Sequence, residues 1–427
     1  MERRRLLRLG AAGAATGAAA LATSACGAGS GSEKVTLRLV AADYGEPGGD
    51  NGSQGYWAQL VRGFEQRHPD IRVKVTVHSW NNVERKVAEL VRAGKAPHLA
   101  QIGSFADYAS QDHLHKVSEL LSIPVQADFL PALAEAGRVR RVQYAIPFAA
   151  STRRLFYNRT LFERAGLDPD TPPRDWGELA SAARALRSAD VRIPYGLPLG
   201  PEEAPAETLM WMLSGGGGYT DTVGRYTIDS VENIRTFTWI RDTLVKPELT
   251  GTNPSHTDRQ TLFNAFSAGE VGMLNGHPSL MRQADRAEVR YGTGRLPGRT
   301  GLTSGTLGVA DWIIAFREPG HREEIGTFLD YVYREKRHYA FASQFNLLPV
   351  TTSASRRMRD APRHRRLRGF LSQLSGAEFY PVGKVSWSKV SADIKDAIGE
   401  AVGGDSTPHT VLSGIQRRAV TADSPSR

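Results

Sequence analysis

Strand-like and helix-like patterns alternate in the first quarter of the chain, and this alternation limits the fold more than any other feature. In 35–39 and 71–77 every second residue is apolar, as in a half-buried strand. The segments 57–64 and 83–91 instead carry apolar stripes with helical spacing. A third strand is expected within 96–103. Strands that alternate with helices of this length predict a parallel α/β sheet.

The length and charge of the chain add two constraints. A chain of 427 residues is too long for one ordinary hydrophobic core, so two lobes are expected. The net charge is +9, and Lys and Arg are spread along the sequence, which indicates a basic, soluble surface. Attraction to an anionic membrane or wall is the alternative. The seven arginines from Arg356 to Arg368 are interpreted as a solvated surface segment, with a contact to the importer or to anionic lipid as the alternative.

Residues 1–26 are expected to be an export signal and are set aside from the fold. The start is rich in arginine, resembles a twin-arginine signal, and is followed by a short, weakly apolar stretch. Cys26 is the single cysteine, so no internal disulfide can form, and its surroundings resemble a lipobox. Lipidation of Cys26 would hold the protein at the outer face of the cytoplasmic membrane. Residues 27–32 are predicted to be a flexible tether.

The stretch 149–179 combines several local signals. Its apolar run 155–157 suits a buried strand, and Asn158 can cap a helix that ends at Gly166. After a proline-rich loop, Asp175 and Glu178 have the spacing of a capping box for the next helix. The stretch therefore predicts a strand, a helix, a loop and a second helix.

The order of residues in this stretch carries a family resemblance. Tyr-Asn, Leu-Phe, Ala-Gly-Leu-Asp, Pro-Pro and Asp-Trp-x-Glu-Leu follow one another from Tyr157 to Leu179. This order resembles the signature of the family 1 extracellular solute-binding proteins, the receptors that deliver sugars to ABC importers. The segments 275–278 (Asn-Gly-His-Pro) and 346–350 (Asn-Leu-Leu-Pro-Val) are also similar to family elements, and the resemblance covers about residues 33 to 400.

The resemblance implies an α/β fold of the two-lobed, periplasmic-binding-protein-like kind (type II). Hinge-linked lobes would enclose a ligand cleft. We expect residues 33–150 and 290–317 to form the first lobe, and residues 151–289 and 318–427 to form the second.

Two lines of argument select candidate ligand-binding residues. In open α/β sheets, ligands gather at the carboxyl ends of the strands, which points to the loops 44–51, 79–82 and 104–108. A sugar has an apolar face and a hydroxyl rim, so its site needs flat aromatic rings beside acids, amides or backbone groups. Together with the family resemblance, these arguments select Tyr44, Glu46, Trp80, Ser104, Phe105, Phe148, Ser151, Glu203, Trp211, Gly217, Asn275, His277, Asp311 and Trp312.

Other functions find less support in the sequence. There is no G-x-S-x-G, H-E-x-x-H or C-x-x-C motif, and no Gly-Lys-Ser/Thr follows the four glycines at 215–218. His113 and His115 alone are weak grounds for a metal site, and only charge favours nucleic acid. We therefore expect no metal, no cofactor and no nucleic-acid partner.

The resulting hypothesis is a receptor, not an enzyme. It would act as a monomer, close its lobes over a mono- or oligosaccharide, and deliver the sugar to the permease subunits of an ABC importer. Two alternatives remain. One is a receptor for a non-sugar solute, and a phosphorylated solute would need clustered basic residues such as Arg153 and Arg154. The other is a secreted carbohydrate-acting hydrolase that uses Glu203.

Overall fold

The computed structural model describes residues 34–44, 52–303 and 305–424. The expected export signal with Cys26, the tether 27–32 and Glu46 lie outside the described residues. Within the described part of the chain, none of the helices combines the length and the apolar character needed to cross a membrane.

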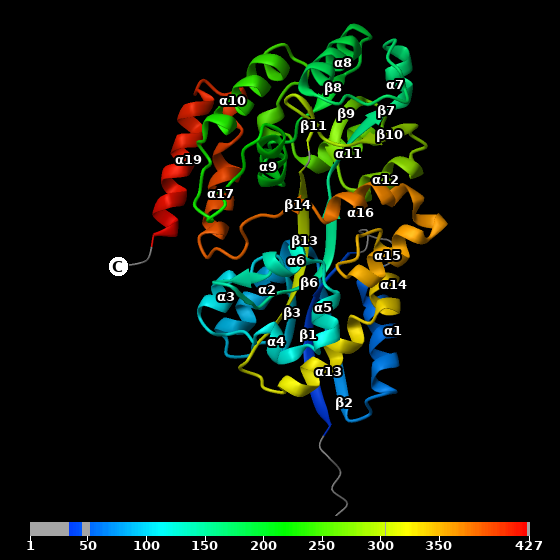
Figure 1. The fold of residues 1–427 in the computed structure, drawn as a ribbon, viewed down its shortest axis with the longest axis vertical. Helices are drawn as coiled ribbons and strands as arrows, with labels where there is room; N and C mark the ends of the chain where they lie inside the picture. The colour runs from blue at the N-terminus through cyan, green and yellow to red at the C-terminus, as the bar shows by residue number, and fades with distance from the viewer. Residues whose placement is uncertain (1–33, 45–51, 304, 425–427) are drawn as a thin grey trace, which may run out of the picture. The chain divides into compact units, whose positions relative to one another are not determined.

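The first lobe is built on a six-stranded sheet (Figure 1). Its strands are β1 (Val35–Ala42), β2 (Ile71–His78), β3 (Leu99–Ile102), β6 (Ile146–Thr152), β13 (Thr306–Ala315) and β14 (Ala377–Glu378). Strand β1 pairs in parallel with β2 and β3, as the sequence predicts. Strand β13 runs antiparallel to β3 and β6 and parallel to β14.

Two parts of the chain supply the other elements around this sheet. The first part carries α1 (Ser53–Glu65), α2 (Trp80–Arg92), α3 (Ala106–Ser110), α4 (Val117–Leu120), α5 (Ile123–Asp128), α6 (Pro131–Ala136) and the hairpin of β4 (Arg138–Val139) and β5 (Val142–Gln143). The second part carries α13 (Arg322–Val332), α14 (Glu335–Phe345), α15 (Thr352–Asp360), the 3₁₀ helix η3 (Pro362–Leu367) and α16 (Arg368–Leu374).

The second lobe is built on a four-stranded sheet with the strand order β10-β7-β9-β8. Its strands are β7 (Arg154–Asn158), β8 (Ile193–Gly196), β9 (Val271–Gly276) and β10 (Tyr291–Gly294), and a short hairpin of β11 (Pro297–Gly298) and β12 (Gly301–Leu302) follows. Its helices are α7 (Arg159–Arg164), α8 (Trp176–Ser188), α9 (Ala204–Ser214), α10 (Val231–Trp239), η1 (Ile240–Val245), η2 (Pro254–His256), α11 (Arg259–Ser267), α12 (Pro278–Arg286), α17 (Trp387–Ala397), α18 (Glu400–Gly403) and α19 (Pro408–Asp423).

The stretch 149–179 folds as its local signals predict. Asn158 ends β7, and its side chain accepts a hydrogen bond from the backbone N–H of Leu161 at 3.1 Å, which caps α7. Gly166 follows α7 with a φ of +71°, a conformation that glycine adopts without strain. The Asp175 side chain accepts from the backbone N–H of Glu178 at 2.8 Å and caps α8.

Strand β13 contributes side chains to separate hydrophobic cores. Leu307, near its start, is buried in the core around α8, α9 and α17, whereas Ile313, near its end, is buried among α1 and α13. The chain changes lobes again between α16 and α17, because α16 packs on β6 and β13, whereas α17 packs on α9 and α19. The earlier crossing lies between β6, which pairs with β13, and β7, which pairs with β9.

The predicted lobe boundaries are wrong in two places. Strand β10 pairs with β7 in the second sheet, so the chain has not yet left the second lobe at residue 290. Helix α13 packs against α1, α4 and β1, so the segment that starts at residue 318 belongs to the first lobe. The physical reason is that β13 itself spans both cores, and α13 then follows it within the first lobe.

The packing of α13 gives a test of this arrangement. A Cβ atom added to Gly326 would lie 2.4 Å from the backbone oxygen of Leu120, so Gly326→Ala should lower the free energy of unfolding by about 1–3 kcal/mol. The control is Gly55→Ala in α1, where a Cβ meets no atom within 4 Å and helix propensity alone should add up to about 1 kcal/mol. Urea denaturation measures both. Equal effects would contradict the packing of α13 on α4.

Candidate ligand-binding site

A cavity of about 300 Å³ is lined by residues from both lobes. The first lobe contributes the start of α2 and the loop that follows β3, at the carboxyl end of that strand. The second lobe contributes the start of α9 and one face of α17. Among the lining residues are Trp80, Glu84, Gly103, Ser104, Glu202, Glu203, Asp311, Tyr380, Trp387 and Lys395.

Glu84 fixes the wall that the first lobe supplies. Its Oε1 atom accepts hydrogen bonds from the backbone N–H groups of Gly103 at 2.9 Å and Ser104 at 3.1 Å. A carboxylate that accepts from two backbone donors holds the loop after β3 against α2. Trp80, one helical turn before Glu84, packs edge-on against the ring of Tyr44 with the ring centroids 5.5 Å apart. The indole is therefore held in place and is only partly buried.

Asp311 reaches the cavity from β13. The pairing of β13 with β6 shifts register between Asp311 and Trp312, and such a bulge redirects side chains. Burial raises the pKa of the Asp311 carboxyl to about 7, and the nearby Tyr44 hydroxyl and Arg153 only partly oppose this shift. At neutral pH, Asp311 is therefore divided between its charged form and a protonated form that can donate a hydrogen bond.

An ion cluster lies where the second lobe meets the cavity. Arg153, whose side chain is 4% exposed, pairs with Glu203, and Arg259 pairs with the other oxygen of the same carboxylate. Arg259 also reaches the Glu202 carboxylate at 2.5 Å. The Nη1 group of Arg153 donates to the Ser151 hydroxyl at 3.0 Å. Both oxygens of Glu203 are thus engaged by guanidinium groups, which hold this acid in a fixed orientation.

Glu207 lies behind this cluster, where a small hollow adjoins Glu203, Asn275 and His277. Its Oε1 atom accepts from Trp211 Nε1 at 2.9 Å and from Asn275 Nδ2 at 3.0 Å. Burial is the main cause that raises the pKa of Glu207 to about 8, although both hydrogen bonds lower it. The pKa of His277 lies well below its usual range, first because of burial and then because of Arg153 and Arg259.

The structure brings together several of the sequence-predicted site residues. Trp80, Ser104, Glu203 and Asp311 line the cavity itself. Asn275 and His277 line the hollow beside Glu203. Tyr44 contacts Trp80, and the Ser151 hydroxyl accepts a hydrogen bond from Arg153. Both residues therefore support side chains at the site without lining the cavity themselves.

Five other candidates do not line the cavity. Phe148 is fully buried and stacks on Trp57 in the first lobe, and Phe105 packs edge-on against Trp312 with the ring centroids 5.4 Å apart. Trp312 follows Asp311 on β13, so its side chain turns to the opposite face, into the core. Trp211 is buried beside Trp176 and Trp239. Gly217 lies against the Asn233 amide, which donates to the Gly218 carbonyl oxygen.

Sequence reasoning missed the part of the wall that the C-terminal segment supplies. Tyr380 and Trp387 stack with their ring centroids 5.3 Å apart and both line the cavity. Lys395 follows two helical turns after Trp387 on α17. The two aromatic residues at the ends of 380–387, with a proline and a glycine between them, are an available signal, but nothing local shows that this segment meets α2.

Comparison with known proteins places the chain in a family. Residues 48–337, more than half of the chain, match the family described as bacterial extracellular solute-binding protein. The two-lobed fold and the cavity lined from both lobes agree with that match, and this protein belongs to the family.

Individual relatives are more distant. A binding protein of Brucella abortus is 26% identical over 397 residues, which cover 90% of this chain and 92% of the relative. The sn-glycerol-3-phosphate-binding periplasmic protein of Salmonella typhimurium is 23% identical over 315 residues and covers 69% of this chain and 71% of its own length.

Two solved structures have the same fold. The ABC transporter solute-binding protein of Thermotoga lettingae bound with α-D-tagatose has a TM-score of 0.76 and 19% identity, and the match covers 91% of this chain and all of that chain. A receptor of Streptomyces glaucescens, solved with acarbose, has a TM-score of 0.75 and 20% identity, and the match covers 92% of this chain and all of that chain.

The raised pKa of Glu207 predicts a pH-dependent stability. The folded protein keeps this proton up to about pH 8, whereas the unfolded chain releases it near the ordinary pKa of 4.5. The stabilising contribution is thus complete below pH 4.5 and is lost as pH rises toward 8. In the unchanged protein, Glu207 should make the free energy of unfolding fall by up to about 1.4 kcal/mol per pH unit in that interval. In Glu207→Gln this part of the pH dependence should be absent.

Denaturation in urea at several pH values between 5 and 8 measures this difference. Exposed Glu232→Gln is the control, and its curve should parallel that of the unchanged protein. A Glu207→Gln curve with the unchanged slope would show that the buried carboxyl does not hold the proton.

Proposed function

We propose that this protein is the substrate-binding receptor of an ABC-type importer and that its ligand is a mono- or oligosaccharide. The observation that carries the proposal is the cavity, where aromatic rings from both lobes lie beside fixed carboxyl groups. Trp80 faces the site from the first lobe, and Tyr380 and Trp387 from the second. Rings can cover the C–H face of a sugar, while Glu84 and Asp311 accept or donate at its hydroxyl rim.

The charges at the cavity favour a neutral sugar over a phosphorylated solute. A phosphate needs basic groups that are free to bind it. Arg153 and Arg259 are both engaged by Glu203. Among the described residues that line the cavity, Lys395 is the one basic side chain, and it stands against the acids Glu84, Glu202, Glu203 and Asp311.

A receptor for a phosphorylated solute is the second candidate, because one of the relatives binds sn-glycerol 3-phosphate. A hydrolase is a weaker alternative. Its proposed acid, Glu203, is held by two arginines, which favours the charged form and opposes a role as proton donor. In our proposal the lobes close over the ligand, exclude water and then dock on the permease, and no bond of the ligand changes.

A calorimetric screen of common mono-, di- and trisaccharides tests the proposal. We expect binding heat with at least one sugar, an increase in melting temperature with the same sugar, and unchanged sugar after prolonged incubation. Heat from glycerol 3-phosphate alone would favour the second candidate, and released product would favour the hydrolase.

The contribution of the indole at the entrance can be measured with that sugar. Trp80→Ala should raise the dissociation constant of that sugar by about tenfold or more, because a rigid aromatic contact is lost. Arg92→Ala, an exposed change on the same helix outside the cavity, should leave the constant within about twofold. Equal affinities for the unchanged protein and Trp80→Ala would place the sugar elsewhere.

We also propose that Cys26 carries a lipid that holds the monomeric receptor at the outer face of the cytoplasmic membrane, after removal of residues 1–25. The lipobox-like sequence around Cys26 supports this proposal. Cys26→Ala should move the protein from the membrane fraction to the medium, since a stable anchor requires the acyl chains. Immunoblots of the two fractions measure this shift. A mature protein whose intact mass includes no lipid would contradict the proposal.

A further inference from the structure

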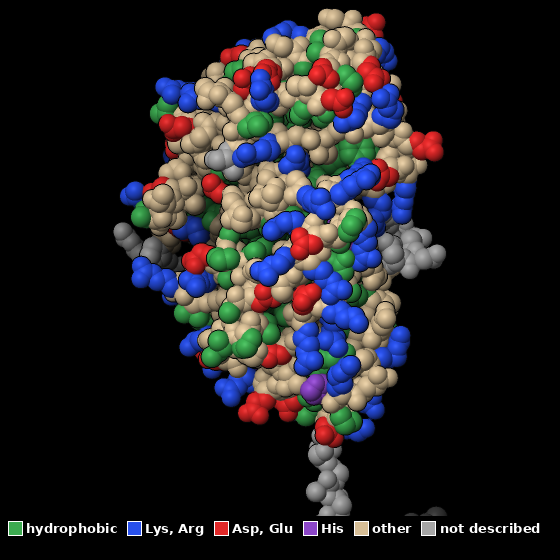
Figure 2. All heavy atoms as spheres, turned by 45° about the vertical axis from the view of Figure 1, so that its right-hand side comes forward, with side chains coloured by type: hydrophobic (Ala, Val, Ile, Leu, Met, Phe, Trp, Pro, Cys, Tyr) green, Lys and Arg blue, Asp and Glu red, His purple; other side chains and the backbone are tan. Residues whose placement is uncertain are grey.

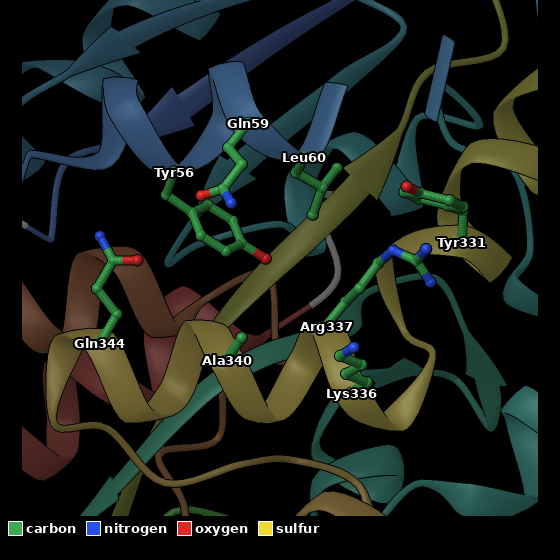
Figure 3. A pocket seen from close by; sticks show the side chains of 8 residues that line it. All are labelled: Tyr56, Gln59, Leu60, Tyr331, Lys336, Arg337, Ala340 and Gln344. Atoms are coloured by element: carbon green, nitrogen blue, oxygen red, sulfur yellow. The ribbon is translucent and has the colours of Figure 1, made fainter. Parts of the chain in front are cut away.

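A second hollow shares no lining residue with the cavity described above. It has a volume of about 300 Å³ and is bounded by α1 on one side and by α14 on the other (Figure 3). Tyr56 and Gln59 enter it from α1, and Lys336, Arg337 and Gln344 enter it from α14. We call it the α1–α14 groove. None of its described lining residues is acidic.

Basic side chains converge at one end of this groove on the ring of Tyr331, the residue before the end of α13. The guanidinium carbon of Arg337 lies 3.5 Å from the ring centroid, that of Arg67 lies 5.8 Å away, and that of Arg334 lies 5.9 Å away. Arg67 also donates to the Tyr331 hydroxyl at 3.3 Å. Figure 3 shows the Arg337 side chain extended toward Tyr331. The ring can stabilise the charge of Arg337 at this distance, whereas Arg67 and Arg334 lie near the limit of about 6 Å for such contacts.

No carboxylate neutralises this cluster within the described part of the chain. Arg67, Arg334, Lys336 and Arg337 form no ion pair there. The acids that are near in sequence have other partners. Glu335 pairs with Arg357 at 3.1 Å, Glu65 pairs with Arg72 at 2.7 Å, and Asp330 accepts from the Ser122 backbone at 3.1 Å. Among residues 34–44, 52–303 and 305–424, the cluster therefore has no paired counter-charge.

Two further features favour an anion in the groove. Helix α14 begins at Glu335, whose carboxylate pairs with Arg357, and the backbone N–H groups of its first turn add a partial positive charge to that of the cations. Tyr56 is only 8% exposed, and its hydroxyl has no hydrogen-bond partner among the described residues. Burial raises the pKa of this hydroxyl, so it keeps its proton at neutral pH and is a potential donor. Figure 3 shows it extending from α1 toward α14.

The surrounding surface has the same sign of charge. Lys and Arg side chains gather on the face that Figure 2 presents. Helix α15 and η3, which follow α14 in the chain, supply Arg356, Arg359 and Arg365 to the exposed surface. Such a field raises the local concentration of anions, while the groove supplies a defined place for one of them.

From these observations we infer that the α1–α14 groove binds a small phosphate-bearing molecule. The phosphate would lie between Arg334, Arg337 and the first turn of α14, and Lys336 would add charge. The apolar walls formed by the Tyr56 ring and Leu60 would contact the rest of the ligand. Guanidinium groups suit this role because they bind phosphate oxygens with paired N–H donors. This site would be separate from the cavity proposed for the sugar.

Calorimetric titration of the full-length protein with phenyl phosphate, in chloride buffer of constant ionic strength, tests the inference. We expect saturable binding of phenyl phosphate and no binding of benzyl alcohol, its uncharged counterpart. The double variant Arg334→Gln/Arg337→Gln should weaken binding by about tenfold or more, since two charge-assisted contacts are lost. Arg356→Gln, an exposed arginine of α15 outside the groove, should change the constant by less than about twofold.

A melting curve in chloride alone checks that each variant folds. If the double variant does not fold, Lys336→Gln replaces it, with an expected weakening of about threefold. The absence of phenyl phosphate binding would overturn the inference. An equal loss of affinity in Arg356→Gln and the double variant would overturn it as well, because the effect would then come from general charge.

Discussion

Strand β13 is the element on which both lobes depend. It pairs antiparallel with β3 and β6, and its two ends bury side chains in different cores. A strand can belong to two cores in this way because its backbone hydrogen bonds continue while successive side chains serve different neighbours. The pairing of β13 with β6 shifts register between Asp311 and Trp312, and these two side chains lie in different surroundings. One side chain turns to the cavity and the other fills the core of the first lobe.

The electrostatics of the cavity follow from burial. Arg153 is almost fully removed from solvent, and such a charge is tolerated only when it is paired and hydrogen-bonded. Glu203 and Ser151 supply those partners, so the second lobe presents a rigid wall in place of a mobile cation. Glu207 and Asp311 meet the same cost differently, by retaining protons to unusually high pH. The wall is therefore polar but nearly neutral, which suits a ligand that is rich in hydroxyl groups.

The α1–α14 groove presents the opposite arrangement. Its cations are at the surface, where water offsets most of their repulsion, and no carboxylate of the described residues pairs with them, in contrast to Arg153 and Arg259. The two hollows thus differ in the feature that matters for ligand class. In the cavity, Glu203 neutralises the nearby arginines. In the α1–α14 groove none of the described lining residues is acidic, so solvent or a bound anion would compensate the charge.

Local sequence determined much of the fold. The caps at Asn158 and Asp175 and the turn at Gly166 depend on neighbours within a few residues, and the parallel pairing of β1, β2 and β3 was predictable from the alternation of strand and helix patterns. The length of the chain indicated two lobes, and the family resemblance added their hinge-linked arrangement and candidate site residues such as Trp80 and Asp311. Only the tertiary structure decided that α13 packs in the first lobe, that Trp312 points to the core, and that Tyr380 and Trp387 meet α2 at one cavity. These outcomes depend on where β13 crosses between the cores and on which face of each element is buried. Both are set by contacts among residues hundreds of positions apart, which no local pattern records.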